Sequence, residues 1–382
     1  MLQPVYIVGL GQIPVQKRHE ATLRQLGAQV VRAALQDAGL DRVGALYLGN
    51  MLSDELQSQK HVAALVADEA GLAGIEALQV RAATATGAAA LRMAALAVAS
   101  GSVSSAVAVG VEKMSDHSAT PALAKALDAQ TEVRDGATMV SLNAQMMWQY
   151  KEKYRPPFDA FANFSVNAHR NAKNNPNALF RRKQVTVEEV MTSRVIVPPL
   201  RLFDCAPICD GAAAIVLVNE KMAARWDRPV RILASTSATD RFRVADRRNP
   251  LSLHASTLSA NTAFHQAGIT REDVDFFEVH DAFSIMACLQ LEAVGFAPRG
   301  EGWKLAVENE IALDGKMPLT TMGGLKARGH PIGASAIYQT IEIAQQLMGS
   351  AGANQLKRAR IGMLQSVGGA GTTILTHLFG RG

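Results

Sequence analysis

The sequence predicts an α/β fold made of two copies of one unit, and three observations support this prediction. Apolar runs at residues 5–9 and 43–50 end in glycine or a polar tip, which is typical of strands covered on both faces. Between them, residues 23–40 carry apolar side chains three and four positions apart and stop at Gly39, as an amphipathic helix does. The same order of elements then returns in the second half of the chain.

The internal repeat is visible in two pairs of segments. Residues 36–50 and 265–280 both contain a helix end, an Ala-Gly pair, a polar turn, an apolar strand and a polar tip. Residues 87–100 and 333–348 both begin with glycine and small residues, read as helices, and are each followed by a short apolar strand. Because two separate pairs keep the same order, we predict two βαβαβ-like halves.

An insertion separates the two halves. We expect residues 1–113 and 201–228 to form the first half and residues 229–382 to form the second. Residues 114–200, which lie between them, contain two Pro-Pro pairs, mixed charge and the main concentration of aromatic side chains. Their apolar content is too high for a disordered linker, so we predict an inserted domain that covers the core.

The composition is that of an ordered globular protein without a strongly basic surface. The chain has 382 residues, 48% of them apolar and 19% charged, so it can bury two cores. Its formal net charge of +5 favours anionic ligands only weakly, and no block of basic residues indicates nucleic acid. Membrane insertion is also not expected, because no apolar run of membrane-spanning length is free of polar breaks.

The three cysteines indicate a reducing compartment. Cys205, Cys209 and Cys288 are an odd number in a long chain, which argues against a disulfide scaffold. Cys205 and Cys209 lack a second cysteine pair or flanking histidines, so we expect no metal site. Since the N-terminal run also lacks a charged leader and a cleavage site, we expect a cytoplasmic protein.

Two histidines stand in motifs that can present an imidazole to a ligand. His330 lies in the glycine-rich segment of residues 323–336, where glycines allow close approach of the backbone and Pro331 fixes the chain. His280 ends an apolar run. A further glycine-rich turn, at residues 367–371, follows another apolar run later in the chain. A glycine turn that carries an incidental histidine is the alternative interpretation.

These motifs resemble the thiolase superfamily, and within it the sterol-carrier-protein-X and archaeal type, over residues 7–379. Six blocks match in the same order along the chain: 92–101, 109–115, 171–176, 202–214, 280–283 and 329–333, followed by the terminal Gly368-Gly369. The resemblance implies a duplicated five-layered α-β-α-β-α fold with an inserted loop domain. It also implies acyl-CoA ligands and a tight homodimer or dimer of dimers.

The resemblance implies that both catalytic cysteines of the family are missing. The position of the nucleophile falls on Thr84, and the acid/base position before the terminal glycines falls on Ser366. The alternative place for the second cysteine is Ala282. A helix N-terminus can lower a thiol pKa into the working range, but a threonine hydroxyl is far too weak an acid for the same effect. A threonine nucleophile would need an adjacent amine base, which the motif does not supply.

What the resemblance retains is the means to stabilise a negatively charged oxygen. In the family, His330 and the residue at the His280 position form one oxyanion hole with a water. Backbone N–H groups at Thr84 and near Gly368 and Gly369 form the other. Such a site can hold an enolate without forming an acyl-enzyme. We therefore expect carbon–carbon bond cleavage or formation of the retro-aldol or non-covalent Claisen type. The alternatives are an acyltransferase that works despite Thr84 and a non-catalytic acyl-CoA-binding subunit.

Coenzyme A is expected as part of the substrate, with no tightly bound cofactor. Guanidinium groups suit its phosphates, so we expect contacts from a cluster of four arginines or from Arg182 in the inserted domain: Arg241, Arg243, Arg247 and Arg248. A solvated charged loop is the alternative for the cluster of four arginines.

Two further expectations concern protein partners. The small apolar residues of the helix at 87–100 and the strand at 106–111 suit a two-fold dimer contact, and the resemblance allows a small OB-fold zinc-ribbon partner protein.

Overall fold

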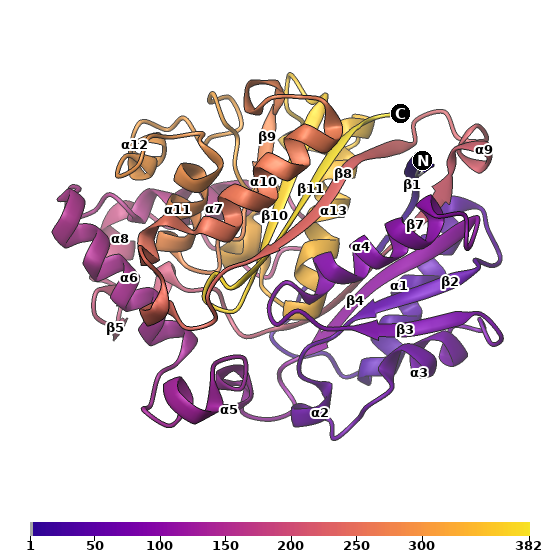
Figure 1. Ribbon diagram of the computed structural model, residues 1–382, viewed down its shortest axis with the longest axis horizontal. Coiled ribbons are helices and arrows are strands. Elements are labelled where there is room, and N and C mark those ends of the chain that lie inside the picture. Colours follow the sequence, from indigo (N-terminus) through magenta and orange to yellow (C-terminus); the bar gives the residue numbers. More distant parts are fainter. Residues whose placement is uncertain (1–2) are drawn as a thin grey trace.

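The computed structural model describes residues 3–382 and shows a mixed sheet surrounded by helices (Figure 1). Met1 and Leu2, the start of the predicted first half, lie outside the described residues. The first half contains β1 (Val5–Gln12), α1 (Leu23–Ala38), β2 (Ala45–Gly49), α2 (Ser53–Leu56), α3 (Val62–Glu69), β3 (Glu76–Val80), α4 (Thr86–Ala99), β4 (Ser105–Lys113), β7 (Asp210–Asn219) and α9 (Glu220–Ala223). The second half contains β8 (Val230–Thr239), α10 (His254–Ala267), β9 (Phe276–Glu278), α11 (Ser284–Val294), α12 (Gly302–Val307), α13 (Ile332–Met348), β10 (Ile361–Gly368) and β11 (Thr373–Arg381).

The strand order confirms the duplication predicted from the sequence. The sheet runs β3-β2-β4-β7-β1-β8-β11-β10-β9, and a short antiparallel pairing of β1 with β8 joins its two halves. Within the first half, β2 pairs in parallel with β3 and β4, while β7 returns antiparallel to β4 and β1. The second half repeats this order from its outer edge, and a single parallel bridge from Phe277 to Leu319 takes the place of the β2–β3 pair.

Alternating side chains divide the core into the five expected layers. On β1, Ile7 packs into the cluster around α4 and α13, whereas Val8 packs into the cluster with α1 and α3. On β11, Phe379 faces α4 and α13, whereas Leu378 packs in the cluster with α10 and α11. Helices α4 and α13 therefore lie between the two half-sheets, with one helical layer outside each half-sheet.

Helix caps form where the sequence places them. Thr22 and Gln25 make a reciprocal capping box at the start of α1, and Gly39 ends the helix in the left-handed region at φ 61°.

The two central helices, α4 and α13, approach closely because glycines lie at their contacts. A Cβ on Gly110 of β4 would lie 2.2 Å from the carbonyl oxygen of Gly333 on α13, and one on Gly87 of α4 would lie 2.5 Å from the same oxygen. These contacts bring the N-termini of α4 and α13 together.

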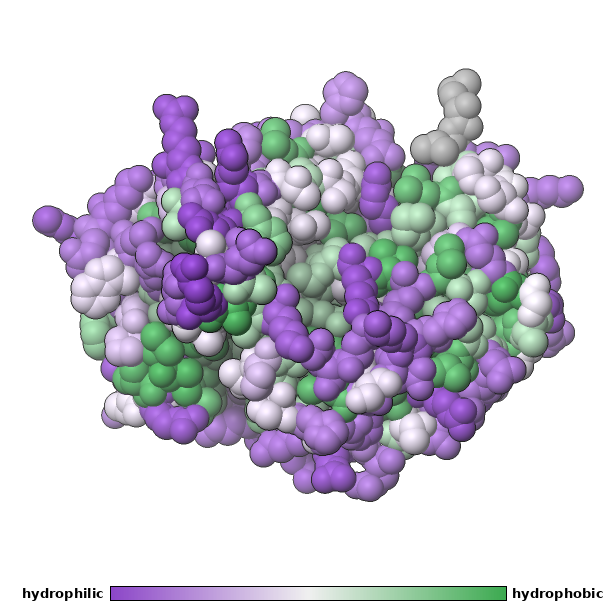
Figure 2. Space-filling model, turned by 60° about the horizontal axis from the view of Figure 1, so that its bottom comes forward, coloured by the Kyte–Doolittle hydropathy of each residue, from purple (hydrophilic) through white to green (hydrophobic). Residues whose placement is uncertain are grey.

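The segment between β4 and β7 adds helices and a small hairpin on one side of the sheet. Its elements are α5 (Ala119–Ala124), α6 (Met139–Tyr154), α7 (Ala162–Ala172), α8 (Val187–Thr192), β5 (Val195–Val197) and β6 (Leu200–Arg201), with a π-helical turn at Ala129–Val133 and a 3-10 turn at Leu202–Asp204. Exposed apolar side chains include Trp148 and Phe158, which are 57% and 72% exposed. Figure 2 shows hydrophobic residues gathered on the side of the molecule where α6 and β5 lie in Figure 1.

The structure corrects one part of the expected dimer surface, the strand at residues 106–111, while the helix at 87–100 remains a prediction. Strand β4, which contains the predicted contact at residues 106–111, is fully buried between β2 and β7 and has no free edge. The free edge of the first half belongs to β3, which among residues 3–382 pairs only with β2. Leu78 on this strand is 51% exposed, and Met93 on α4 is 39% exposed. The small residues of β4 serve close packing within one chain instead.

Candidate active site

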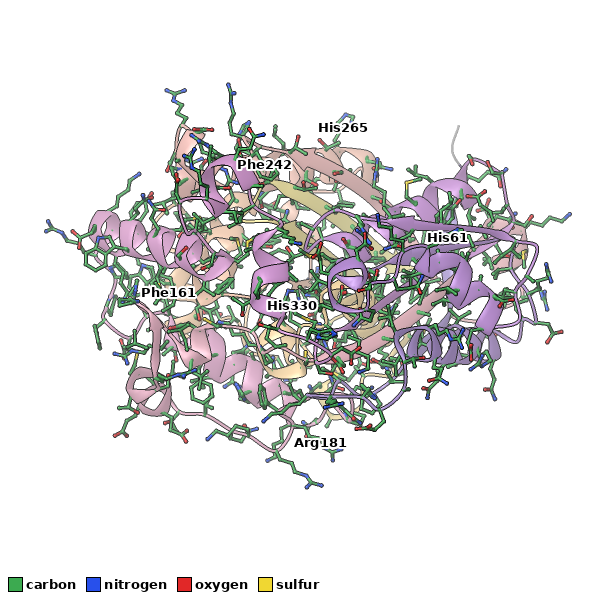
Figure 3. The ribbon with its side chains drawn as sticks, turned by 90° about the horizontal axis from the view of Figure 1, so that it is seen from below. His61, Phe161, Arg181, Phe242, His265 and His330 are labelled. Carbon is green, nitrogen blue, oxygen red and sulfur yellow. The ribbon has the colours of Figure 1, made fainter. Side chains whose placement is uncertain are left out.

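A cavity of about 830 Å³ opens between the two halves and the inserted segment. It brings together four predicted site residues, Thr84, His280, His330 and Gly369, and the first and last of these lie 285 positions apart along the chain. Most of the remaining lining is apolar and comes from the segment between β4 and β7 and from the start of α11 with the residue before it: Met114, Leu123, Met139, Val140, Ile196, Leu202, Phe203, Ile208, Phe283 and Met286. Figure 3 shows His330 near the middle of the molecule. The arrangement is that of a ligand cavity with a few convergent polar groups.

His330 is held from three sides. Gly329 precedes it at φ 114°, a conformation that favours glycine, and Pro331 follows as the residue before α13. The His330 N–H donates to Cys209 Sγ at 3.1 Å, and ring atom Nδ1 lies 2.7 Å from Ser335 Oγ in the first turn of α13. Burial lowers the pKa of His330 well below its ordinary value, so the imidazole is neutral at pH 7. Only its far edge can serve a ligand.

His280 lies just beyond β9 and faces His330. The two rings meet edge to face, with centroids 5.2 Å apart. The backbone of His280 is fixed by Gln290, whose side chain accepts from its N–H at 3.3 Å and donates to its carbonyl at 3.0 Å. Burial lowers the pKa of His280 to about 3, and its Nδ1 has no hydrogen-bond partner among residues 3–382. The site therefore presents two neutral imidazoles side by side.

Thr84 stands in a strained turn before α4. Ala83 has φ 48°, an uncommon value for a residue with a side chain. The Thr84 hydroxyl donates to the carbonyl oxygen of Val367 at 2.5 Å, and the Thr84 N–H has no acceptor within the described chain. Gly369, which also lines the cavity, has φ 65° and likewise keeps a free N–H in residues 3–382. Two backbone donors thus flank a hydroxyl that is already engaged.

Two other predicted residues lie next to the cavity without lining it. Ser366 is 1% exposed within β10, where it pairs with Leu375. Gly368 packs against the Thr84 turn, because a Cβ there would lie 2.5 Å from the Ala82 carbonyl oxygen. Strand alternation explains the difference, since Val367 and Gly369 line the cavity and their neighbours point elsewhere.

None of the arginines predicted to bind CoA lines this cavity. Arg247 is buried and donates to the Ala370 carbonyl and to Thr372 Oγ1, so it braces the turn that carries Gly369. Arg243 is paired with Asp246 at 2.7 Å. Arg182, Arg241 and Arg248 are exposed and are not among the lining residues, although Arg182 directly precedes Lys183, which lines the cavity.

Several charged or polar groups in the cavity lining were not assigned as site residues from the sequence, among them Lys183, Arg194, Lys326 and Cys205. Lys183 and Arg194 are exposed cations in the lining, one position after Arg182 and one before β5. Lys326 is 2% exposed and donates to Ser284 Oγ at 2.5 Å. Cys205 also faces the cavity, and burial raises the pKa of its thiol to about 12. The basic run at residues 181–183 signalled Lys183, whereas no sequence pattern distinguished the others.

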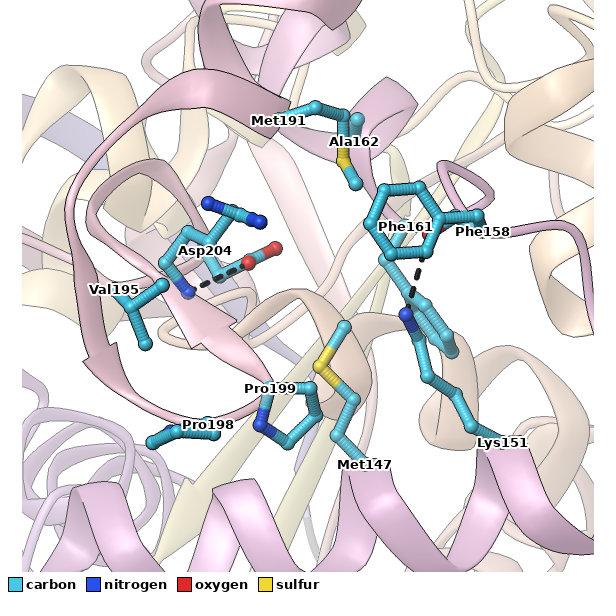
Figure 4. Close-up of a pocket in the computed structure, with 11 residues that line it drawn as sticks. Met147, Lys151, Phe158, Phe161, Ala162, Met191, Val195, Pro198, Pro199 and Asp204 are labelled. Atoms are coloured by element: carbon cyan, nitrogen blue, oxygen red, sulfur yellow. Dashed lines mark hydrogen bonds between the residues drawn. The ribbon is translucent and has the colours of Figure 1, made fainter.

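A second, smaller cavity of about 230 Å³ lies against the inserted segment (Figure 4). It is lined by Met147, Phe158, Phe161, Met191 and the Pro198-Pro199 pair, with Lys151 and Asp204 at its polar side. Lys151 Nζ donates to the Phe158 carbonyl at 3.2 Å. Residues of the β5–β6 hairpin alternate between the two cavities, because Val195 faces the smaller one and Ile196 the larger. The hairpin therefore forms a wall between them.

Residues 3–382 contain no group of three histidine, cysteine or acidic side chains arranged to hold a metal ion. All three cysteines are free. Within the same residues no helix is both long and apolar enough to cross a membrane.

Comparison with known families gives two matches that together span nearly the whole chain. Residues 5–221 match the model of the thiolase N-terminal domain, and residues 236–381 match the thiolase C-terminal domain-like model. The gap between the matches begins after β7 and ends within β8, close to where the duplicated halves meet.

Several known proteins are similar over their full length. An acetyl-CoA acetyltransferase of Methanothermobacter thermautotrophicus is 41% identical over 384 residues, with both chains covered completely. A benzoylsuccinyl-CoA thiolase subunit of Thauera aromatica is 30% identical over 96% of this chain and 94% of its own. Among solved structures, an Ltp2-ChsH2(DUF35) aldolase superimposes with a TM-score of 0.87 at 22% identity, covering 100% of this chain and 98% of its own. That likeness concerns the fold.

Proposed function

Because the chain belongs to the thiolase superfamily, we propose that it acts on CoA thioesters and stabilises an acyl-CoA enolate without forming an acyl-enzyme. The observation that best supports this proposal is that the Thr84 hydroxyl is not activated as a nucleophile. Its hydroxyl donates to the Val367 carbonyl, and no imidazole accepts its proton. Cys205, the thiol in the cavity lining, has its pKa raised to about 12 and stays protonated at pH 7. The cavity thus lacks an activated nucleophile but keeps its oxyanion donors.

The proposed chemistry uses those donors on the thioester oxygen. In a retro-aldol cleavage, a base takes the β-hydroxyl proton, the Cα–Cβ bond breaks, and its electron pair moves onto the thioester as an enolate. In the tautomer that carries its proton on Nε2, His330 accepts from the Ser335 hydroxyl at Nδ1 and donates from Nε2 to the enolate oxygen, with the His280 ring beside it. Ser335 Oγ also lies 3.1 Å from the Pro331 carbonyl oxygen, the alternative acceptor for its proton. The deprotonated β-oxygen becomes the carbonyl oxygen of a ketone or aldehyde that carries Cβ away, and protonation at Cα releases a shorter acyl-CoA. A decarboxylating or non-covalent Claisen reaction would pass through the same enolate.

Acyl transfer is the second candidate, because the relative at 41% identity is an acetyl-CoA acetyltransferase. In this chain it would require Thr84 to lose its proton at neutral pH, which neither a nearby base nor its intrinsic acidity supports. A purely structural acyl-CoA-binding role is favoured less, since His280, His330, Thr84 and Gly369 all line one open cavity.

For the CoA phosphates we propose Lys183 and Arg194, which lie in the cavity lining, in place of the arginines at 241–248. Arg194 is exposed and has no ion pair within residues 3–382, whereas Lys183 Nζ donates to Glu189 Oε1 at 3.2 Å and would exchange this exposed ion pair for a phosphate. Lys183→Glu should raise the dissociation constant for CoA, whereas Arg248→Glu should leave it unchanged. The opposite result would place the CoA phosphate site at the arginines of residues 241–248.

Partners belong to the same proposal. The solved aldolase with similar fold contains a DUF35 component, which fits the expected small OB-fold zinc-ribbon subunit. Light scattering of this protein mixed with a purified DUF35-type protein would test it, and two unchanged masses would count against it. The three free cysteines fit a reducing, cytoplasmic setting.

The test of the function is covalent chemistry at Thr84. Incubation of the wild type with acetyl-CoA should leave no acetyl adduct in an intact-mass spectrum. Thr84→Cys should gain one, because a thiol at the N-terminus of α4 can ionise there. Thr84→Ser serves as the control and should remain unmodified. An adduct on wild-type Thr84 would replace the enolate proposal by acyl transfer.

A further inference from the structure

A buried carboxylate holds together the elements that carry the two oxyanion donors. Glu112 lies at the end of β4 and has no exposed surface. Its Oε1 accepts from Asn50 Nδ2 at 2.8 Å and from the Leu52 N–H at 3.0 Å. Its Oε2 accepts from the Met51 N–H and the Gly333 N–H, both at 2.9 Å. Four donors from two separate segments therefore converge on one side chain.

Only an ionised carboxyl group can satisfy this arrangement. Two carboxylate oxygens accept four hydrogen bonds, whereas an amide or a protonated acid would turn a donor toward N–H groups. Burial raises the pKa of Glu112 to about 7, and the backbone donors, with Arg81, act in the opposite direction by favouring the ionised form. Removing the charge would leave buried N–H groups without acceptors. An unsatisfied buried N–H group lowers the free energy of unfolding by more than one hydrogen bond contributes to it.

The bond to Gly333 links this carboxylate to the active site. Gly333 is the second residue of α13, three positions after His330, and Ser335 in the same turn holds the His330 ring. Gly333 also packs against Gly87 of α4, the helix that begins after Thr84. The start of α13 thus sets the distance between the His330 ring and the Thr84 N–H.

We propose that Glu112 is a positioning residue, which fixes the N-terminus of α13 against α4 so that His330 and the Thr84 N–H meet the same substrate. This inference rests on the proposed function for its catalytic meaning. Its structural content does not, because it states where His330 lies in the free protein. A misplacement of about 1 Å in such a site can cost roughly a hundredfold in rate.

Glu112→Gln tests the proposal, with Asp275→Asn as the matched control. Asp275 is also a buried carboxylate that accepts backbone N–H groups, from Arg360 at 2.7 Å and Ile361 at 3.1 Å, but it lies outside the cavity lining. Both variants should lose thermal stability. In proteins labelled at histidine carbon, only Glu112→Gln should shift the ring signal of His330, which is assigned from its absence in His330→Asn.

The second readout is exchange of the Cα hydrogens of propionyl-CoA in deuterated water. Glu112→Gln should lower the exchange rate at least tenfold while the dissociation constant of propionyl-CoA stays within twofold. Asp275→Asn should change neither. If Glu112→Gln does not fold, Asn50→Ala removes a single donor to the same carboxylate and should shift the His330 signal by a smaller amount.

The outcomes separate this inference from the proposed function. An unchanged His330 signal in folded Glu112→Gln, or in Asn50→Ala if that variant takes its place, overturns the positioning role whatever the activity. A shifted signal in a protein whose wild type shows no exchange supports the positioning role and counts against the enolate chemistry. A shifted His330 signal in Asp275→Asn would show that general loosening, and not Glu112, moves the ring.

Discussion

The side chain at position 84 shows how far single residues could be predicted. The sequence placed Thr84, His280 and His330 together through motifs, and all three line the same cavity. It could not show that the Thr84 hydroxyl donates to Val367, because that contact joins residues 283 positions apart. Lys326 and Cys205 were missed for a similar reason. Their exposure to the cavity depends on packing between segments, which local composition does not record.

Buried histidines predict a specific dependence of stability on pH. Burial lowers the pKa of His377 to about 3, far below the ordinary value near 6.5. At acidic pH the unfolded state therefore binds a proton that the folded state does not bind. The contribution of the neutral imidazole to the free energy of unfolding is complete above pH 6.5 and is lost as the pH falls. For one such histidine the free energy of unfolding should fall by about 1.4 kcal/mol between pH 7.5 and pH 5.5.

Urea unfolding of the wild type and His377→Gln at these two pH values checks this expectation. The pH-dependent loss should be smaller in the variant by that amount. His265→Gln, at an exposed position of α10 labelled in Figure 3, is the control and should behave as the wild type. Equal pH dependence in wild type and His377→Gln would mean that the imidazole titrates normally in the folded protein.

At the scale of elements, local sequence patterns predicted the strands and helices well, but they did not predict which elements pair or pack with each other. The run at residues 106–111 is small and apolar, which fits a strand packed on its own chain as well as one at a dimer contact. The structure places it in the middle of the sheet, between β2 and β7. Pairing partners depend on long-range topology, so the sequence could not choose between the two.

The free edge of β3 predicts where a dimer forms. Leu78 is 51% exposed on a strand whose outer edge is unpaired within residues 3–382, and Met93 of α4 is 39% exposed. An exposed apolar edge strand invites pairing with another chain, and two-fold symmetry would pair β3 with its own copy. Sedimentation velocity at micromolar concentration should show a dimer for the wild type and a monomer for Leu78→Lys.

Val307→Lys provides the matched control for the dimer. Val307 is 44% exposed on α12, away from the sheet edge, so its replacement should leave the dimer intact. A wild-type monomer, or a dimer that survives Leu78→Lys, would exclude β3 as the contact.

At the scale of the whole molecule, duplication was the most informative feature of the sequence. Repeated helix ends and strands predicted two equivalent halves, and the strand order of the structure repeats accordingly. The consequence for function is that α4 and α13 meet at their N-termini, where Gly87 and Gly333 allow close approach. The first half contributes the Thr84 turn to the shared cavity, and the second half contributes the segments that carry His280, His330 and Gly369. The CoA arginines were predicted from charge alone, and charge did not identify which cations the fold turns toward that cavity.

The central claim is that this cavity stabilises an acyl-CoA enolate, and hydrogen exchange at Cα measures it most directly. Protonation of the enolate is the reversible last step of the proposed cleavage, so bound propionyl-CoA should exchange its Cα hydrogens in deuterated water. His330→Ala should slow this exchange by roughly a hundredfold to a thousandfold, the effect of losing one oxyanion donor. Its dissociation constant for propionyl-CoA should change little, since CoA supplies most of the binding. Wild-type protein that binds propionyl-CoA without exchange, or His330→Ala that exchanges at the wild-type rate, would contradict the account.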